Sequence, residues 1–409
     1  MMMCGLVLTR KGDVMERKQL LTYSAQDAFK TCRRKYYHSY ELGLRRIDES
    51  KALRMGSAGH SGVEAVGKGL GLEVACEAVR GHYENCPPHF DAYQWEIEQE
   101  TMLRLVCAYD WRWKDAKIEN IKTEFQFQMP LVNPATGAET PIWDLAGKID
   151  GIVRLEDGRL AVKETKFLGE DIGQDSSLYR RLRRDSQISI YMIAARKAGF
   201  NVSTVLYDCI RKPAISATSV PFTDEDGIKI VLDANGQRVR NANGKTWRQT
   251  ADTEKGYVLQ SRPMTVSEWG EKLSSDIGER PDFYFQRTEV ARLDDDLRET
   301  ELELWSIQLA IREAQRAGRW FRTVGRNTCQ FCAFDSICDR TLQPGEIPEG
   351  FEILSNPHPE LSCESVKDVA SSLCQNKKEA LEPIALNHAD LGIETNSGSI
   401  TESHLQTNT

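Results

Sequence analysis

Residues Trp143–Phe167 read WDLAGKIDGIVRLEDGRLAVKETKF, and the rest of the chain is best interpreted around this stretch. Two runs of β-prone residues, 145–155 and 159–167, flank the short segment EDG at 156–158. Asp-Gly between two such runs is a strong signal for a tight turn. The sequence therefore predicts a β-hairpin with its turn at 156–158.

Three charged residues of this hairpin form a candidate catalytic group. Asp150 lies in the first expected strand. Glu164 and Lys166 lie two residues apart in the second, where alternation places them on one face. Two carboxylates beside a lysine suit a hard divalent cation. The alternative is a hairpin with ordinary surface charges, because strand faces often carry residues of opposite charge.

Further motifs accompany the hairpin in order. GSAGH, which ends at His60, precedes it, and Gln187-x-x-x-Tyr191 follows it at the start of an expected helix. With Gly147-x-x-Asp150 and Glu-x-Lys, these motifs resemble the RecB-like branch of the PD-(D/E)xK nuclease superfamily over roughly residues 22–340. The resemblance implies an α/β fold: a restriction-endonuclease-like core with a mixed sheet flanked by helices, helical additions and an iron–sulfur clamp.

The resemblance also implies a metal site for Mg²⁺ or Mn²⁺ with four ligands. They are Asp150, Glu164, the backbone carbonyl of Thr165, and His60. Lys166 would orient the attacking water or stabilise charge in the transition state. His60 depends most on the motif series, because a lone histidine on a helix is more often structural than a ligand.

Two residues beyond the metal site are implied to contact the substrate. Gln187 and Tyr191 are one helical turn apart, so both can face a bound strand, although such a pair is also common in helix packing. Glu124, on an expected strand over 122–129, is another acidic residue near the site, to which we assign no direct metal role. Lys163 departs from the family, where this strand position is usually apolar.

The cysteines point to a second metal-binding group. The chain has 11 cysteines, an odd number, and no convincing signal peptide, which argues against a disulfide framework. Cys329-x2-Cys332-x5-Cys338 and the distant Cys32 resemble the 4Fe–4S ligands of AddB-type and CRISPR-associated RecB-like nucleases. We call these four residues the cysteine clamp and expect a structural role for it. Four thiolates also permit Zn²⁺.

The charge distribution allows nucleic-acid binding despite a formal net charge of −8. Residues 341–409 contain 11 acidic and 3 basic residues, so residues 1–340 are neutral overall. Local basic clusters matter more than the total charge for phosphate binding. One cluster comprises Arg180, Arg181, Arg183 and Arg184, which we expect either to contact DNA or to form a solvated helix face.

The chain divides into three expected regions. Residues 1–21 are an extension of uncertain status, 22–340 the nuclease domain, and 341–409 an acidic and disordered tail. Within the domain, Pro, Gly, Asn and Asp punctuate 213–260, which we interpret as a β-hairpin insertion. Helices are expected over 22–46, 53–71, 73–117, 185–199, 265–278 and 294–320.

Together these patterns favour a metal-dependent DNA nuclease, more specifically an exonuclease that prefers single strands, in DNA repair, recombination or phage DNA processing. Because the chain has no Walker A motif, any helicase would be a separate partner. One alternative is a non-catalytic DNA-binding or assembly subunit that retains the fold. Another is a zinc-stabilised protein-interaction module. No apolar run approaches the length of a membrane span, so a cytoplasmic protein is expected.

Overall fold

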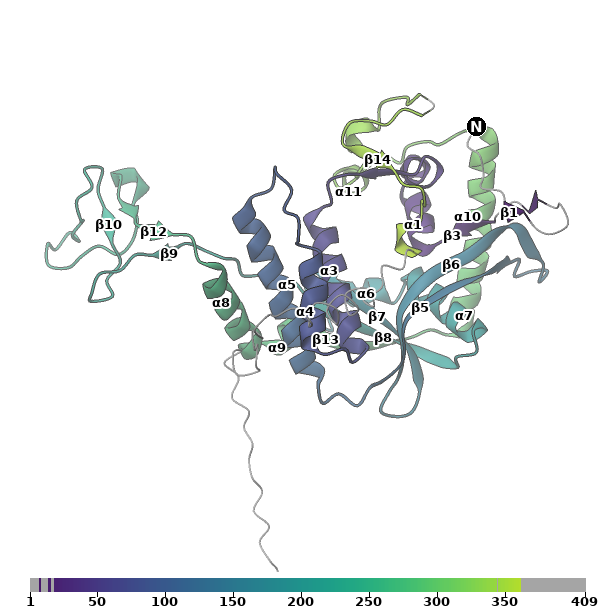
Figure 1. Cartoon of the computed structure of the whole chain (residues 1–409), viewed down its shortest axis with the longest axis horizontal. Helices are drawn as coiled ribbons and strands as arrows, with labels where there is room; N and C mark the ends of the chain where they lie inside the picture. Colours follow the sequence, from purple (N-terminus) through teal and green to yellow (C-terminus); the bar gives the residue numbers. More distant parts are fainter. Residues whose placement is uncertain (1–6, 9–13, 16–17, 344, 362–409) are drawn as a thin grey trace, which may run out of the picture.

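The computed structural model describes residues 7–8, 14–15, 18–343 and 345–361. Its centre is a six-stranded mixed sheet in the order β13-β8-β7-β6-β3, with β5 also paired to β6 (Figure 1). The strands are β3 (Gln19–Leu21), β5 (Glu119–Val132), β6 (Glu139–Arg154), β7 (Leu160–Leu168), β8 (Val202–Arg211) and β13 (Phe285–Ala291). The pairs β3–β6 and β7–β8 are parallel, and the other pairs in this sheet are antiparallel.

The expected hairpin is formed by β6 and β7. The amide of Gly158, which has a φ of 86°, donates to the carbonyl of Leu155 and closes the turn. Glycine adopts this left-handed conformation without the steric cost that other residues have. The hairpin prediction is therefore confirmed.

The long strand β6 has three partners for two edges. Because β5 pairs with β6 over most of its length, β7 and β3 share the other edge. β7 pairs with residues 151–154 of β6, whereas β3 pairs with residues 143–145. Residues 146–150 of β6 therefore have no strand partner on this edge of the sheet. Asp150 lies at the end of this gap that adjoins the residues paired with β7.

Helices cover both faces of the sheet, so the expected fold class, an α/β core with a mixed sheet flanked by helices, is confirmed. One face packs in a single apolar core with α1 (Tyr23–Thr31), α6 (Ser177–Leu182), α7 (Ser186–Lys197) and α10 (Asp294–Ala317). The other face packs with α3 (Lys51–Gly67), α4 (Leu72–Gly81), α5 (Ala92–Trp113), α8 (Val266–Glu279) and α9 (Pro281–Tyr284). None of the helices in the described ranges is long and apolar enough to cross a membrane.

The first expected helix is interrupted at its cysteine. Cys32 has an extended backbone, with φ −163° and ψ 119°, and separates α1 from α2 (Arg33–Tyr36) and a π-helical turn at Tyr37–Glu41. Thr22 caps the start of α1, because its hydroxyl accepts a hydrogen bond from the amide of Ala25.

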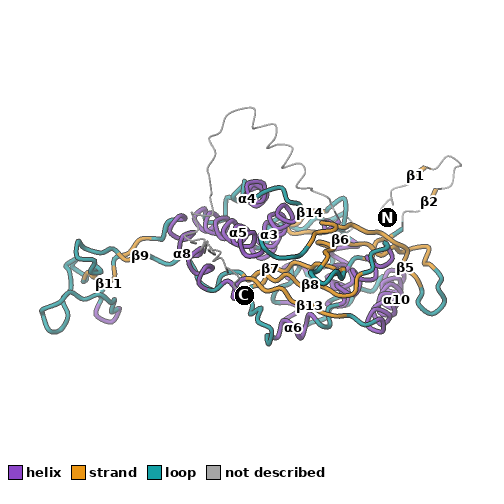
Figure 2. The backbone as a smooth tube through the Cα atoms, turned by 90° about the horizontal axis from the view of Figure 1, so that it is seen from below, coloured by secondary structure: helices purple, strands orange, loops and turns teal. Residues whose placement is uncertain are grey.

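The segment interpreted as an insertion projects from the body beside α8 (Figures 1 and 2). It contains two small antiparallel sheets, β9 (Val220–Pro221) with β12 (Ser261–Arg262) and β10 (Val231–Leu232) with β11 (Val258–Leu259). Val231 is the buried hydrophobic residue of this arm, so the arm has almost no core of its own.

The region assigned to the tail is partly ordered. Strand β14 (Phe351–Ile353) pairs with β4 (Leu44–Arg46), and Glu360 accepts a hydrogen bond of 2.6 Å from the Thr22 hydroxyl. Residues 362–409, where the rest of the expected disordered tail falls, lie outside the described residues. At the other end, β1 (Val7–Leu8) pairs with β2 (Val14–Met15). A short helix α11 (Arg326–Cys329) precedes the last cysteines of the clamp.

Candidate active site

Asp150 lies where β6 separates from β7. The ladder ends at the pair Gly151 and Lys163, so the backbone amide of Thr165 has no strand partner on this side and donates instead to Asp150 Oδ2 at 2.8 Å. This hydrogen bond fixes one carboxylate oxygen at the opening. The sheet geometry therefore places Asp150 beside Glu164 without a ladder between them.

Glu164 and Lys166 form an ion pair on β7, with Lys166 Nζ 2.7 Å from Glu164 Oε1. The same Nζ donates to Gln187 Oε1 at 2.6 Å, and Gln187 Nε2 donates to the Tyr191 hydroxyl at 3.0 Å. The structure thus joins the two motifs into one chain of hydrogen bonds from β7 to α7. Glu164 is 3% exposed, and its Oε2 has no hydrogen-bond partner.

The electrostatics of Glu164 reflect its burial. Burial, together with the nearby Asp150, raises the pKa of its carboxyl group to about 8 against the opposing effect of Lys166. Burial disfavours the charge on Lys166, but Glu164 outweighs this effect, and the pKa of Lys166 is raised. Lys166 is therefore a cation at neutral pH, and a cation beside Glu164 and Asp150 would favour the ionised carboxylate.

His60 reaches this site from α3. Its Nδ1 is 3.6 Å from Asp150 Oδ2, and its ring packs edge-on against Phe167 with 5.6 Å between ring centres. Close approach of the helix is needed for this contact. Gly59 allows it, because a Cβ there would lie 2.4 Å from the Phe167 ring.

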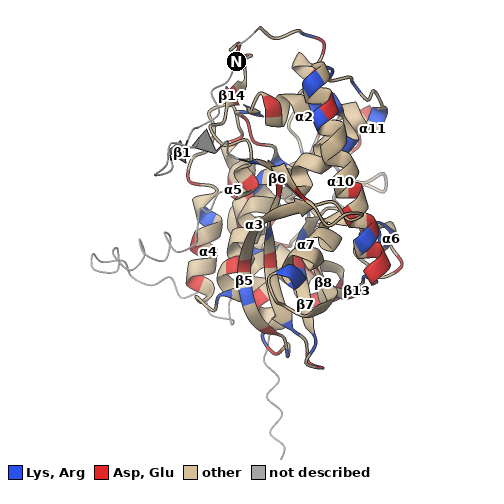
Figure 3. Ribbon diagram, turned by 90° about the vertical axis from the view of Figure 1, so that its right-hand side faces the viewer, with Lys and Arg blue, Asp and Glu red and all other residues tan. Residues whose placement is uncertain are grey.

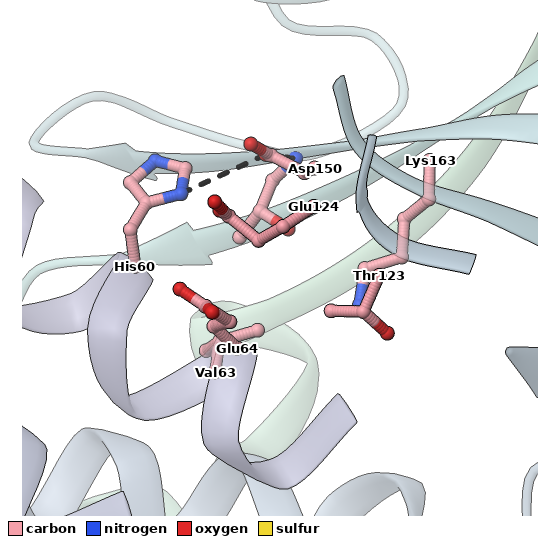
Figure 4. A pocket seen from close by; sticks show the side chains of 8 residues that line it. His60, Val63, Glu64, Thr123, Glu124, Asp150 and Lys163 are labelled. Atoms are coloured by element: carbon pink, nitrogen blue, oxygen red, sulfur yellow. Dashed lines mark hydrogen bonds and ion pairs between the residues drawn. The ribbon is translucent and has the colours of Figure 1, made fainter. Parts of the chain in front are cut away.

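Two further acidic residues face the same space: Glu124, which was expected near the site, and Glu64, which was not predicted. The carboxylates of Glu64 and Glu124 turn toward the region between His60 and Asp150 (Figure 4). Glu124 pairs with Lys148 at 2.6 Å, and burial, Glu64 and Asp150 raise the pKa of Glu124 against the effect of Lys148. Glu64 follows His60 by four residues, so helical spacing could have identified it.

These residues fit a magnesium-type site with few protein ligands. The described residues contain no group of three or more His, Cys, Asp or Glu side chains placed to hold a metal ion. Asp150 and the unpartnered Oε2 of Glu164 nevertheless supply hard oxygen ligands. Mg²⁺ usually retains several waters and binds through one or two carboxylates together with substrate phosphates. The donor set therefore suits Mg²⁺ or Mn²⁺.

The arginine cluster lies apart from this chain of contacts. Arg180, Arg181, Arg183 and Arg184 are exposed on and after α6. Arg181 pairs with Glu170, with Nη1 and Oε2 3.0 Å apart. Figure 3 shows basic and acidic residues mixed over much of the fold, with α2 basic along its length. The structure places these arginines at the surface but joins none of them to the catalytic motifs.

The cysteine clamp residues lie in one region. The Thr323 amide donates to Cys32 Sγ at 3.4 Å, and Arg322 Nη2 donates to the Cys338 carbonyl at 2.6 Å. Burial raises the pKa of the Cys332 thiol, and Cys32 and Cys338 are close enough to raise it further. No three of the described cysteines are arranged as metal ligands, so the structure does not establish a cluster.

The comparison with family models agrees with this fold. A model of the PD-(D/E)XK nuclease superfamily matches residues 20–339. Comparison with curated proteins finds no match. A solved structure described as "Crystal structure of SSO0001" aligns with 80% of this chain and 89% of its own, at 13% identity and a TM-score of 0.30.

Proposed function

The chain belongs to the PD-(D/E)XK nuclease superfamily, and from this premise we propose that it cleaves DNA at the site of Asp150, Glu164 and Lys166. The observation that carries the proposal is the buried Glu164, with one oxygen paired to Lys166 and the other unpartnered, beside Asp150. A structural ion pair would have both oxygens satisfied, because an unpaired buried acceptor is costly. An unpartnered buried carboxylate oxygen near a second carboxylate supports metal binding.

Each residue has a distinct part in the proposed reaction. Asp150, Glu164, the Thr165 carbonyl and His60 would hold Mg²⁺ or Mn²⁺, which when bound polarises phosphate and lowers the pKa of water. Lys166 stabilises the charge that develops on the phosphate, and Gln187 fixes the position of its ammonium group. Tyr191 in turn holds the amide of Gln187.

We further propose a single-strand exonuclease of the RecB-like type, which acts in DNA repair, recombination or phage DNA processing and uses a separate helicase where duplex must be opened. The mixture of basic and acidic residues along the fold supports a strand held locally rather than a broad duplex-binding face (Figure 3). The exposed arginines at 180–184 would contact the strand outside the centre.

We also propose that the cysteine clamp binds a 4Fe–4S cluster, with Zn²⁺ as the less favoured occupant. The supporting observation is the convergence of Cys32, Cys332 and Cys338 from opposite ends of the domain. The four thiolates have the chemistry that either group requires. The bound cluster or metal ion would have a structural role.

The test of the nuclease proposal uses Asp150→Asn and Lys166→Met, with Asp144→Asn as a matched control. Asp144 lies on the same strand but pairs with Lys18 at 2.8 Å. With Mn²⁺ and end-labelled oligonucleotides, we expect the first two variants to lose cleavage by on the order of a hundredfold or more while still binding DNA. The control should cut normally.

Near wild-type cleavage by both variants would remove the hairpin from the active site. A wild-type protein that binds but does not cut DNA would favour the non-catalytic alternative. The labelled ends report the polarity of cleavage in the same assay.

A further inference from the structure

Four polar residues, of which three are buried and Arg287 is partly buried, form a group that the catalytic motifs do not use. Lys163 on β7 is 3.7 Å from Asp208 Oδ2 on β8 and donates to the Tyr109 hydroxyl of α5 at 3.2 Å. The same Asp208 oxygen accepts from Tyr109 at 2.6 Å and from Arg287 of β13 at 3.0 Å. We call these four residues the buried quartet.

The buried quartet carries an excess positive charge. Burial opposes ionisation of Asp208, but Arg287 and Lys163 outweigh it and lower the pKa of Asp208. Lys163 Nζ and Arg287 Nη2 approach the same oxygen of Asp208, at 3.7 Å and 3.0 Å. Two cations thus share one carboxylate in the interior. A net buried charge is costly unless another group offsets it.

A cavity of about 200 Å³ lies beside the buried quartet. Lys114, Lys163 and Arg287 line it with three positive charges, against one carboxylate from Asp110. Two of its lining residues have a buried donor without a hydrogen-bond partner, Trp113 Nε1 and Arg287 Nε. Asp208 Oδ1 also lacks a partner, but Asp208 does not line the cavity. The lining therefore suits an anion that accepts hydrogen bonds.

The position of this cavity, next to the pocket that contains Asp150, points to the kind of anion that it would bind. Val63 and Glu64 of α3 line the pocket that contains His60 and Asp150, and Val66 and Gly67 of the same helix line the cavity. Lys163 lines both. One turn of helix, about 5 Å, therefore separates the two sites along α3. We propose that the cavity binds a phosphate group of the nucleic-acid strand adjacent to the one that is cleaved. This inference rests on the proposed nuclease function.

The test uses residues whose change leaves the buried quartet intact. Replacing Lys163 or Arg287 would leave Asp208 with fewer partners and could unfold the protein. Trp113→Phe removes the indole donor and keeps a ring against Arg287, which lies 4.1 Å from it. Lys114→Glu reverses an exposed charge of the lining. The matched control is Lys117→Glu, an exposed lysine outside the cavity that pairs with Glu156 at 2.6 Å.

Binding of a fluorescent single-stranded oligonucleotide is measured without divalent metal, with a 5′-phosphate, a 3′-phosphate or neither. We expect Trp113→Phe and Lys114→Glu each to weaken binding by about tenfold, the value of one hydrogen bond to a charged group. Lys114→Glu should also make the slope of the logarithm of the binding constant against the logarithm of salt concentration shallower by about 0.7. Lys117→Glu should change binding less than twofold.

The three oligonucleotides distinguish the source of the phosphate. A terminal phosphate in the cavity makes the wild type prefer one phosphorylated end, and Trp113→Phe removes that preference. An internal phosphate makes the variants weaken all three oligonucleotides equally. The inference would be overturned if Trp113→Phe and Lys114→Glu bound the oligonucleotides as tightly as the wild type and Lys117→Glu do. Mn²⁺-dependent cleavage by the same proteins would still leave the nuclease proposal standing.

Discussion

Glu124 has an unusual backbone opposite the proposed centre. Its neighbours Thr123 and Phe125 pair with Gly151 and Ile149, so Glu124 lies across from Asp150 in the register. Among the described residues other than glycine, it alone has a positive φ, 56°. Such a conformation costs about 1–3 kcal/mol, and such residues cluster at functional sites. The strain at Glu124 therefore supports a functional pocket at this place in the sheet.

His38 makes the stability of the cysteine region sensitive to acid. It is 1% exposed, neither ring nitrogen has a hydrogen-bond partner, and its ring packs on Phe334. Burial, with Arg34 and Arg322 nearby, lowers the pKa of His38 to about 4. Because the unfolded chain takes up a proton near pH 6.5 and the folded chain only near pH 4, this residue removes stability as pH falls between these values.

The effect of His38 amounts to at most about 1.4 kcal/mol per pH unit. We expect the melting temperature of the wild type to fall more steeply from pH 7 to pH 5 than that of His38→Phe, which cannot titrate. Thermal unfolding of both proteins across this range is the measurement. Parallel pH profiles would show that His38 does not control the acid response.

Helix α3 positions His60 by packing closely on β7. Gly59 faces the Phe167 ring, and a Cβ at Gly62 would lie 2.7 Å from Val106. By contrast, a Cβ at Gly56 would meet no atom within 4 Å. Glycine weakens a helix interior relative to alanine. Close packing against neighbouring side chains thus requires glycine at positions 59 and 62, whereas no close contact requires it at position 56.

The same helix offers a matched pair of substitutions. Gly59→Ala should push α3 away from β7, destabilise the protein by about 1–3 kcal/mol and impair cleavage through the displaced His60. Gly56→Ala should stabilise the protein by about 0.5–1 kcal/mol and leave cleavage unchanged. Denaturant unfolding and nuclease rates of both variants test this. A harmless Gly59→Ala would mean that the helix position is not fixed by Phe167.

At the scale of the whole molecule, the sequence predicted what local patterns determine. The hairpin of β6 and β7 follows from its turn residues, and α10 from its acidic first turn and apolar periodicity. The hairpin by itself predicted the group of Asp150, Glu164 and Lys166, whereas the proximity of His60, which lies on α3, followed only from the family resemblance. The superfamily match confirms the fold that the resemblance implied.

Long-range pairing explains what the sequence could not predict. Lys163 departed from the family pattern, and its partners Asp208 and Tyr109 lie more than 40 residues away in the sequence. Nothing near Lys163 in the sequence indicates a buried carboxylate. The break at Cys32 likewise has no local breaker such as glycine or proline, and the segment beside it, 321–323, comes from the other end of the domain.

The proposed clamp would connect these two ends of the domain. Cys32 and Cys329 are 297 residues apart in the sequence. Because metal binding is coupled to folding, loss of one ligand should lower both the metal content and the melting temperature. We therefore expect Cys32→Ala to lose iron and sulfide and to unfold at a lower temperature than the wild type. Cys86→Ala, at an exposed cysteine whose thiol contacts only backbone carbonyls, is the matched control.

The measurement is anaerobic analysis of iron, sulfide and zinc together with thermal unfolding of the wild type, Cys32→Ala and Cys86→Ala. Burial of Cys32, which is 8% exposed, predicts some destabilisation from the lost side chain alone, so the metal content decides. Wild-type iron in Cys32→Ala would remove Cys32 from the clamp. Zinc in place of iron would keep the clamp and correct its occupant, because four thiolates bind either.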